Sequence, residues 1–332
     1  MKIYLICDYR ENCKGLKLNN IIYNDHASKI SIKKIQESII DLGYKCEIIE
    51  GTKELIKHCH SKAISSKDIY INLSDGTDHL HGRVQVPLIS ELYELNYSGA
   101  NALQAAIANN KSFSKLFVND LGIRTPKGTR IQKKDNLNLK DKFQSNDFPV
   151  IVKPNCLGSS IGIDDSSICY DLTELKKKIK KIRSKYNDII IERYISGYEV
   201  TNLVIGNSNK NPINDVIIFS LNENFFFQNQ VFGYSEKFKK LRKLNTNCEF
   251  ICESLIQEIK TSTLKIKNTL GVNDIIRIDY RINHKGEVFF LEMNTAPRVS
   301  MTSEIGTICI NRNLQFMDII KLYIETVINR VS

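Results

Sequence analysis

The fold of this chain is decided by residues 275–294, which read IIRIDYRI, NHKG and EVFFLEMN in succession. Two runs rich in β-branched and aromatic residues flank a short polar turn that contains glycine, and this pattern predicts a β-hairpin. If Asn283 lies opposite Gly286 in the turn, Phe290 faces Asp279 across the ribbon. The pairing of every other residue then follows from this register.

Alternation of side chains along the two strands divides the predicted hairpin into a polar face and an apolar face. The polar face carries Arg277, Asp279, Phe290, Glu292 and Asn294. The apolar face, which belongs to the core, carries Ile276, Ile278, Tyr280, Leu291 and Met293. In this register Glu292 faces Arg277, and Asp279 is a diagonal neighbour of Glu292 at about 7 Å between Cβ atoms.

Two carboxylates and an amide oxygen on one sheet face need a physical reason. Mg²⁺ supplies one, because it takes hard oxygen ligands and keeps positions for water and phosphate. Asp279, Glu292 and Asn294 are therefore the candidate metal ligands. The alternative is a structural ion pair between Arg277 and Glu292, with Asp279 solvated.

A glycine-rich segment lies upstream of the hairpin, after a short β run at 150–153. Alternation puts Ile151 and Lys153 on one face of this strand. Residues 158–162, GSSIG, then offer backbone N–H groups that can approach a phosphate closely. The segment is not a Walker A loop, since no Lys-Ser or Lys-Thr follows its second glycine. A simple structural turn is the alternative, and the acidic hairpin downstream favours the phosphate-binding interpretation.

The first 100 residues predict a parallel α/β unit, because strand and helix patterns alternate along them. The predicted strands are 3–7, 45–50 and 68–73, and a helix is predicted at 30–42. Ligands of such sheets bind beyond the carboxyl ends of the strands. This rule draws attention to residues 74–78, SDGTD, directly after the third strand.

Three packed units are expected in a chain of this length. We place their boundaries at 1–100, 101–190 and 191–332. The remaining predicted elements are a helix at 102–122, a strand at 188–192, a helix at 250–270 and a last helix at 313–330.

Composition and charge exclude several classes of protein. No run reaches the roughly 18 apolar residues of a membrane span, and the start lacks signal-peptide features, so a cytoplasmic protein without a membrane partner is expected. Much of the net charge of +10 comes from the basic tract at 176–185. Its apolar residues recur at helical spacing, which indicates a solvated helix face and no nucleic-acid partner. The nine scattered cysteines favour free thiols.

A series of short motifs, in this order, resembles the D-alanine–D-alanine ligase branch of the ATP-grasp superfamily. The motifs are 72–76, 84–87, 97–99, 110–115, 152–154, 158–162, 191–194, 197–199, 277–279 and 292–297. The resemblance covers most of the chain from Asn72 onward. It implies an ATP-grasp fold of the α/β class, with an N-terminal parallel α/β domain before the two ATP-grasp lobes.

The resemblance also implies roles for individual residues. The lysines that hold the ATP phosphates correspond to Lys111, Lys153 and, across a variable stretch, Lys237. The loop that closes over the phosphates contributes Gly158, Ser159 and Ser160; Ser159 is grouped with the catalytic residues, as is Arg277, which lies beside the reacting carbonyl. The hinge that recognises adenine contains Glu192, Tyr194 and Ile195, and Glu199 lies near the ribose. Asp279, Glu292 and Asn294 match the ligands of two Mg²⁺ ions, for which Mn²⁺ can substitute. Ser303 lies near the carboxylate of the second substrate.

Two departures from the family pattern concern the substrates. The family carries a paired-glycine turn, a serine and a glutamate near its N-terminus, whereas residues 7–13 here read CDYRENC, which leaves Glu11 as a substitute. The family also has glycine where this chain has Arg298. We therefore predict an ATP-dependent ligase that joins an amino acid or other carboxylate to an amine through an acyl phosphate, with substrates other than two D-alanines. Glu11, Arg298 and Ser303 are the candidate substrate-binding residues.

Three other functions remain open. One is a D-alanine–D-alanine ligase of cell-wall synthesis, and another is an ATP-grasp phosphotransferase that makes no amide. The third is a nucleotide-binding or nucleic-acid-binding module without catalysis. The partners we expect are small-molecule substrates and a second copy of the chain in a homodimer.

Overall fold

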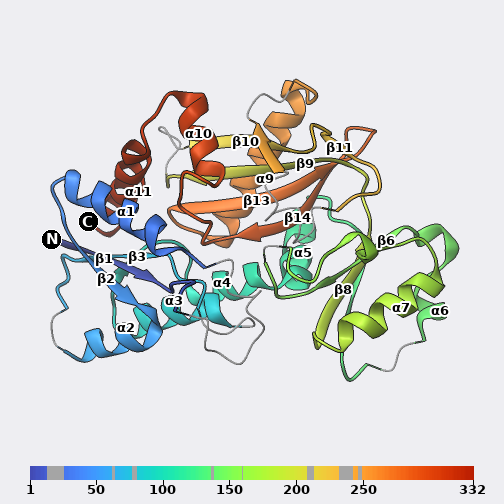
Figure 1. Cartoon of the computed structure of the whole chain (residues 1–332), viewed down its shortest axis with the longest axis horizontal. Coiled ribbons are helices and arrows are strands. Elements are labelled where there is room, and N and C mark those ends of the chain that lie inside the picture. The colour runs from blue at the N-terminus through green and yellow to red at the C-terminus, as the bar shows by residue number, and fades with distance from the viewer. Residues whose placement is uncertain are drawn as a thin grey trace.

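The computed structural model of this chain describes residues 1–12, 26–61, 64–76, 81–135, 138–158, 160–207, 213–231, 242–245 and 249–332. Its strands form three sheets, and the mixed α/β architecture is confirmed. The N-terminal and central sheets lie towards opposite ends of the long axis, and the largest sheet lies between and above them (Figure 1). Within the described ranges, no helix is both long and apolar enough to cross a membrane.

The N-terminal sheet is parallel and has the strand order β2-β1-β3-β4. Its elements are β1 (Lys2–Cys7), α1 (Lys29–Asp41), β2 (Lys45–Glu50), α2 (Gly51–His60), β3 (Ile69–Asn72), α3 (Gly82–Leu92) and β4 (Asn96–Tyr97). The predicted strands and first helix are confirmed. The carboxyl ends of β1 and β3 meet, since Ser74 donates a hydrogen bond to Asp8 and the Gly76 N–H donates to Asp8 Oδ2 at 2.9 Å.

The helix predicted at 102–122 is wrong as one element. It consists of α4 (Ala102–Asn109) and α5 (Lys111–Asp120). Asn110 has extended backbone angles and its side chain accepts a hydrogen bond from Phe113 N at 3.2 Å. Asparagine is a strong N-cap because its side chain satisfies an amide of the first turn. The cap therefore starts a second helix and sets a new direction for Lys111.

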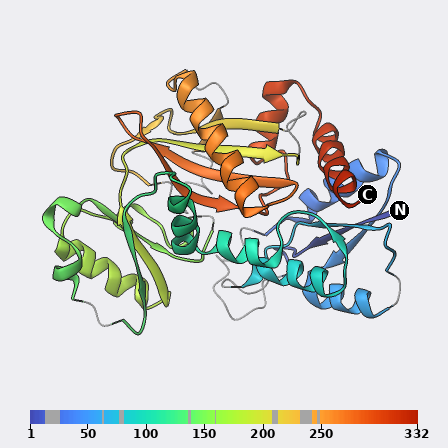
Figure 2. The same cartoon turned by 180° about the vertical axis from the view of Figure 1, so that it is seen from behind.

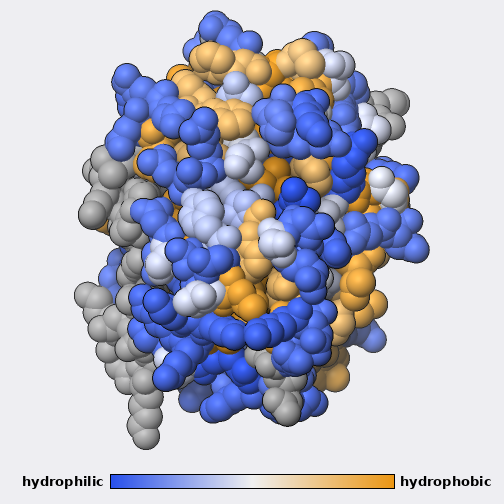
Figure 3. Space-filling view, turned by 90° about the vertical axis from the view of Figure 1, so that its right-hand side faces the viewer, coloured by the Kyte–Doolittle hydropathy of each residue, from blue (hydrophilic) through white to orange (hydrophobic). Residues whose placement is uncertain are grey.

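The central sheet has the order β5-β8-β6-β7 and is antiparallel. Its elements are β5 (Gly128–Gln132), α6 (Leu139–Lys142), β6 (Val150–Pro154), β7 (Ile168–Cys169), α7 (Leu172–Arg183) and β8 (Asp188–Arg193), with 3-10 turns at Ser145–Asp147 and Asp165–Ser167. Val150 and Val152 lie in the core beneath α7 and Lys153 lies on the opposite face, as predicted. The end of the molecule that carries α7 is covered mainly by hydrophilic residues (Figure 3). Most lysines of the basic tract are exposed on α7, as expected of a solvated helix face, whereas Lys178 is buried and pairs with Asp164.

The largest sheet has the order β12-β10-β9-β13-β14, and β11 pairs with β9. Its strands are β9 (Gly197–Ile205), β10 (Ile213–Leu221), β11 (Phe226–Phe227), β12 (Arg242–Asn245), β13 (Ile275–Ile282) and β14 (Val288–Asn294). The helix α9 (Glu253–Leu270) covers one face of this sheet (Figure 2). The predicted hairpin is confirmed as β13 and β14.

The register of the hairpin differs from the predicted one. Asp279 lies directly opposite Glu292, and Arg277 lies opposite Asn294. The prediction had placed Phe290 opposite Asp279, so β14 is shifted by two residues. A shift by an even number keeps each side chain on its own face of a sheet. The polar face at the end of the hairpin therefore survives the error in register.

A β-bulge after Asp279 accounts for one of the two residues, and the turn accounts for the other, because Ile282 pairs with Val288. Beyond it Tyr280 pairs with Phe290, which leaves Leu291 as the extra residue of β14. An extra residue reverses the alternation on one side of the bulge. Phe290, predicted on the polar face, is instead fully buried with its ring centroid 6.3 Å from that of Tyr280. Leu291, predicted in the core, is only half-buried.

The last predicted helix begins later than expected. Residues 304–331 form α10 (Glu304–Arg312) and α11 (Phe316–Val331), and Asn313 ends α10 in the left-handed conformation. The helix α11 packs against α1, and a single hydrophobic core contains residues of β1, α1, β9, β10, β13 and α11. The N- and C-termini consequently lie close together (Figure 1). The seven cysteines of the described segments are free thiols, as predicted.

Candidate active site

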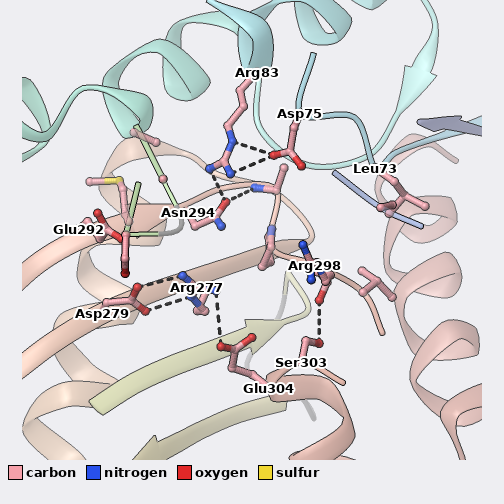
Figure 4. Close-up of a pocket in the computed structure, with 18 of the residues that line it drawn as sticks. Leu73, Asp75, Arg83, Arg277, Asp279, Glu292, Asn294, Arg298, Ser303 and Glu304 are labelled. Carbon is pink, nitrogen blue, oxygen red and sulfur yellow. Dashed lines mark hydrogen bonds and ion pairs between the residues drawn. The ribbon is translucent and has the colours of Figure 1, made fainter. Parts of the chain in front are cut away.

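A pocket of about 670 Å³ lies where the three sheets meet. Its lining comes from the loop after β3, the start of α3, the start of α5, the loop after β6, the polar face of the hairpin, and the segment between β14 and α10. The residues predicted at this site that line the pocket are Lys111, Gly158, Ser160, Glu199, Arg277, Asp279, Glu292, Asn294, Arg298 and Ser303. Figure 4 shows the part of the pocket around β13 and β14.

Arg277 forms ion pairs with two carboxylates at the end of the hairpin. Its Nε and Nη2 donate to Asp279 Oδ1 at 3.0 Å and Oδ2 at 2.9 Å, and its Nη1 lies 3.6 Å from Glu304 Oε1. Burial alone would lower the pKa of Arg277, but the charges of Asp279 and Glu304 raise it above its ordinary value. The structural alternative, an Arg277–Glu292 ion pair with Asp279 solvated, is wrong. Arg277 pairs with Asp279, and Glu292 pairs with Lys111.

Lys111 approaches the hairpin from the start of α5. Its Nζ lies 3.0 Å from Glu292 Oε2 and donates to the Leu157 carbonyl at 2.5 Å. Burial would raise the pKa of the Glu292 carboxyl, but the Lys111 ammonium outweighs burial and lowers the pKa to about 2. Glu292 is thus ionised at neutral pH.

Asn294 completes the polar face. Its Oδ1 accepts hydrogen bonds from the Ala296 N–H at 3.0 Å and from Arg83 Nη1 at 3.1 Å. Arg83 in turn pairs with Asp75 (Figure 4). Each predicted metal ligand therefore contacts a basic side chain of this chain.

The donor set of the polar face fits a hard divalent cation. Asp279 and Glu292 lie directly opposite each other on neighbouring strands, and Asn294 is on the same face. Within the described segments there is no group of three or more His, Cys, Asp and Glu side chains that would suit a metal. Two carboxylates with one amide oxygen are instead typical of Mg²⁺ bound together with substrate phosphates.

A second cluster of charged residues connects the central sheet to α5, and none of its members lines the pocket. Glu192 is almost completely buried and contacts Lys153 through Oε1 and Lys115 Nζ through Oε2, the latter at 3.2 Å. Burial lowers the pKa of Lys115 to about 8 and exceeds the opposing effect of Glu192. The two lysines lower the pKa of Glu192 although burial would raise it. Glu192, predicted in the adenine hinge, thus has its carboxylate turned towards two lysines.

Lys115 belongs to this cluster but was not named individually from the sequence. Its Nζ also donates to the carbonyl of Leu291 at 2.9 Å, which connects α5 to the bulge of β14. Lys111 and Lys115 are four positions apart on one helix, and this spacing puts both side chains on the same face. Because Lys111 had been predicted, this spacing could have indicated Lys115 as well.

The remaining predicted nucleotide-binding residues lie at the start of β9 and before it. The Tyr194 hydroxyl donates to the carbonyl of Gln230 at 2.6 Å. Glu199 Oε2 accepts from Arg281 Nη2 at 2.5 Å, and Arg281 lies over the rings of Tyr194 and Phe227 at 5.7 and 5.3 Å from their centroids. Ile195, which follows Tyr194 in the chain, is half-buried.

The glycine-rich segment is described except at its centre. Gly158 and Ser160 line the pocket, and Ser160 has a positive φ of 56°. Ser159 and Lys237, predicted as catalytic and phosphate-binding residues, lie outside the described residues.

The candidate substrate residues are separated. Arg298 and Ser303 line the pocket, and the Ser303 hydroxyl donates to the Arg298 carbonyl at 2.9 Å and begins α10 as its N-cap. Glu11 is exposed, does not line the pocket, and its Oε1 accepts from the Lys29 N–H at 3.4 Å. Its neighbour Arg10 lines the pocket instead.

Four charged lining residues, Arg10, Asp75, Arg83 and Glu304, were not predicted individually. The sequence did indicate the segment that contains Asp75, because residues 74–78 follow β3 at the carboxyl edge of a parallel sheet, where ligands bind. The other three reach the pocket through contacts between elements that are distant in the sequence.

The fold and the polar face of the β13–β14 hairpin define an enzyme of the ATP-grasp class that forms C–N bonds. The protein-family model described as D-ala D-ala ligase C-terminus matches residues 117–325. The chain belongs to the D-alanine–D-alanine ligase family, as the resemblance implied.

Relatives and solved structures agree with this assignment. The chain is 27% identical over 297 residues to the D-alanine–D-alanine ligase of Aquifex aeolicus, covering 88% of this chain and 92% of the relative. It is 28% identical over 291 residues to that of Pelagibacter ubique, covering 87% and 89%. The fold is similar to that of D-alanine–D-alanine ligase from Bacillus anthracis complexed with ATP, with a TM-score of 0.74, 20% identity, and coverage of 100% and 98%. It is also similar to VanG D-Ala:D-Ser ligase from Enterococcus faecalis, with a TM-score of 0.70, 19% identity, and coverage of 98% and 99%.

Proposed function

We propose that the chain is an ATP-dependent ligase that joins two amino acids, with D-alanine as the first candidate for both substrates. The observation that carries the proposal is the polar face of the hairpin, with Asp279, Glu292 and Asn294 in one pocket with Lys111 and the glycine-rich segment. The relatives' names support D-alanine as the substrate better than the expectation of a different acid–amine pair.

The first half-reaction makes a carboxylate reactive. One carboxylate oxygen of the first amino acid attacks the γ-phosphorus of ATP, and the bond to the β–γ bridging oxygen breaks as ADP leaves. Lys111 and Lys153 neutralise phosphate charge in this step. Mg²⁺ held by Asp279, Glu292 and Asn294 supplies further charge stabilisation when it is bound.

The second half-reaction forms the amide. The neutral amine of the second amino acid attacks the acyl carbon, and the bond from that carbon to the phosphate-bearing oxygen breaks. Phosphate leaves with one original carboxylate oxygen and takes up the proton that the nitrogen loses. Arg277 donates hydrogen bonds to the oxyanion that forms in between, and one such donor stabilises the transition state by roughly 3–4 kcal/mol. Closure of the segment containing Gly158 and Ser160 keeps water from hydrolysing the acyl phosphate.

Two measurements test the proposal. The purified chain, incubated with ATP, Mg²⁺ and D-alanine, is expected to release ADP and form the dipeptide. With ¹⁸O in the D-alanine carboxylate, one labelled oxygen is expected in the released phosphate. Absence of both ADP and dipeptide with D-alanine, together with turnover of another amino acid, would overturn the choice of substrate.

A second candidate keeps the chemistry and changes the substrates. Arg298 lines the pocket where the family has glycine, and Glu11 does not line it. An additional cation near the acceptor favours a substrate with an extra acidic group. A panel of amino acids with mass detection of the product separates the two candidates. It also separates both from a phosphotransferase, whose product would keep the phosphate.

A further inference from the structure

Arg83 connects the N-terminal sheet to the polar face of the hairpin. It is the second residue of α3, yet its Nη1 donates to Asn294 Oδ1 at 3.1 Å across 211 positions of sequence. Its side chain is only 18% exposed, and it lines the pocket. Figure 4 shows it reaching Asn294 from the side opposite Arg277.

The surroundings of Arg83 hold its guanidinium in place. Its Nε and Nη2 lie 3.0 and 2.9 Å from Asp75 Oδ1. The loop that carries Asp75 touches the start of α3, because a Cβ on Gly76 would lie 2.3 Å from the Gly82 carbonyl oxygen and Gly76 has a φ of +71°. Only glycine tolerates this backbone and this approach. Arg83 is thus preorganised at the edge of the pocket.

The Asn294 oxygen contacts both Arg83 and the Ala296 N–H. A carbonyl oxygen has two lone pairs. A metal ion bound by this oxygen would therefore take the lone pair that Arg83 contacts, since the Ala296 contact is a local turn within the same segment. Arg83 Nη1 would then give up the Asn294 oxygen and can donate to another acceptor in the pocket.

We propose that this acceptor is the substrate, and that Arg83 binds the carboxylate of the first amino acid and the acyl phosphate formed from it. The inference rests on the ligase function proposed above. A guanidinium is planar and matches a carboxylate or phosphate with paired N–H donors. It also carries five donors, so pairing with Asp75 is compatible with binding the substrate.

The location agrees with this role. The carboxylate being phosphorylated must lie between the metal-binding face and the acceptor amine. Arg83 borders that face at Asn294, while Arg277 borders it on β13 and Arg298 lies in the segment after β14 (Figure 4). The N-terminal sheet thus contributes its own cation to a site that the other two sheets build.

A purely structural role for Arg83 and a substrate-binding role predict different effects of its removal on metal affinity. If Arg83 only orients Asn294, its removal weakens the metal site, as loss of such supporting contacts typically does by 10–100-fold. If Arg83 competes with the metal for the Asn294 oxygen, its removal leaves metal affinity unchanged or higher. The sign of the change separates the two roles without any measurement of activity.

The experiment compares the full chain with Arg83→Met and Arg83→Gln. Glutamine keeps a neutral donor for Asn294 but no charge. The matched control is Arg312→Met, which removes an arginine paired through Nε and Nη2 with Asp215 and outside the pocket lining. Calorimetry measures Mn²⁺ binding with a non-hydrolysable ATP analogue, and then D-alanine binding to that complex.

We expect both Arg83 variants to weaken D-alanine binding by about tenfold or more, because each loses a charged hydrogen bond. Mn²⁺ should bind at least as tightly as to the wild type, and Arg312→Met should change neither affinity. Unchanged affinity for D-alanine in the Arg83 variants would overturn the inference. It would also be overturned if Arg83→Met bound Mn²⁺ more weakly than the wild type and Arg83→Gln bound it as tightly as the wild type. If the wild type binds no D-alanine, the proposed substrate fails. The same comparison is then decided with the amino acid that does support ADP release.

Discussion

The difference in unfolding free energy between the wild type and Lys115→Met should change with pH in favour of the wild type as the pH rises. Lys115 is buried, and burial lowers its pKa in the folded protein from 10.5 to about 8. Between these values the unfolded chain binds a proton that the folded protein does not. Stability rises with pH wherever the unfolded state binds more protons. The wild type therefore gains unfolding free energy through this interval, and Lys115→Met does not.

The magnitude follows from the pKa difference, since one pKa unit corresponds to about 1.4 kcal/mol. Between about pH 7 and pH 9.5, the difference in unfolding free energy between wild type and Lys115→Met should grow by about 2 kcal/mol in favour of the wild type. Urea unfolding followed by circular dichroism at both pH values measures it. Taking the difference cancels tyrosines and cysteines that titrate in the same range.

Lys33→Met is the matched control, because Lys33 lies on the exposed side of α1 and its loss reports the effect of removing one surface lysine. A difference for Lys115→Met that stays constant or shrinks as the pH rises would refute the reasoning. Lys115 would then keep its proton in the folded protein, and its contact with Glu192 would outweigh its burial.

Three further outcomes are expected. Asp279→Asn should reduce ADP release by about 100-fold or more, because it removes a charged metal ligand; a coupled ADP assay over a range of Mg²⁺ concentrations measures it. Arg281→Met should raise KM for ATP by about tenfold without a matching change for the amino acid, because it removes the charged hydrogen bond to Glu199; steady-state kinetics with each substrate varied separates the two. Arg330→Met should lower the unfolding free energy by about 3 kcal/mol, because it leaves the fully buried Asp274 without its ion pair; urea unfolding measures the loss.

Each outcome has a clear opposite. ADP release by Asp279→Asn that high Mg²⁺ fully restores would mean that the carboxylate is only one of several adequate ligands. A rise in KM for the amino acid after Arg281→Met would move Arg281 from the nucleotide to the substrate end. Unchanged urea unfolding of Arg330→Met would show that hydrogen bonds from Gly99 N and Asn207 Nδ2 are sufficient for Asp274.

The polar face at the end of the hairpin could be predicted from sequence, whereas its register and the faces of Phe290 and Leu291 could not. Alternation depends on adjacent residues, so Asp279, Glu292 and Asn294 were assigned to one face correctly. The bulge has no glycine or proline to mark it. It lies where Lys115 donates to the Leu291 carbonyl and where the Phe290 N–H donates to the carbonyl of Arg124 at 2.8 Å. These are tertiary contacts of β14, and local sequence does not specify them.

The partners of the charged residues were equally inaccessible. The motif resemblance grouped Lys111 and Lys153 with the hairpin; Lys111 and the hairpin line one pocket, whereas Lys153 contacts Glu192 and does not line it. The resemblance did not indicate that Glu192 would face two lysines, since this requires α5 to lie beside both the central sheet and β14. Arg83 reaches Asn294 only because the N-terminal sheet packs beside the largest one. Contacts between units depend on how separate sheets meet, and no periodicity in one segment encodes that.

The shared core of the N-terminal and largest sheets limits how this enzyme can move. Residues of β1 and α1 pack in one cluster with residues of β9, β13 and α11. Among the described residues, the larger core cluster of the central sheet stays within Ile131–Ile191, and a small second cluster joins Ile151 and Ile168 to Tyr194 and Val231. Two of the three units are therefore expected to behave as one rigid block. Admission of the nucleotide and release of products are then left to rotation of the central unit, whose hinges must be the chain crossings before Gly128 and after Arg193.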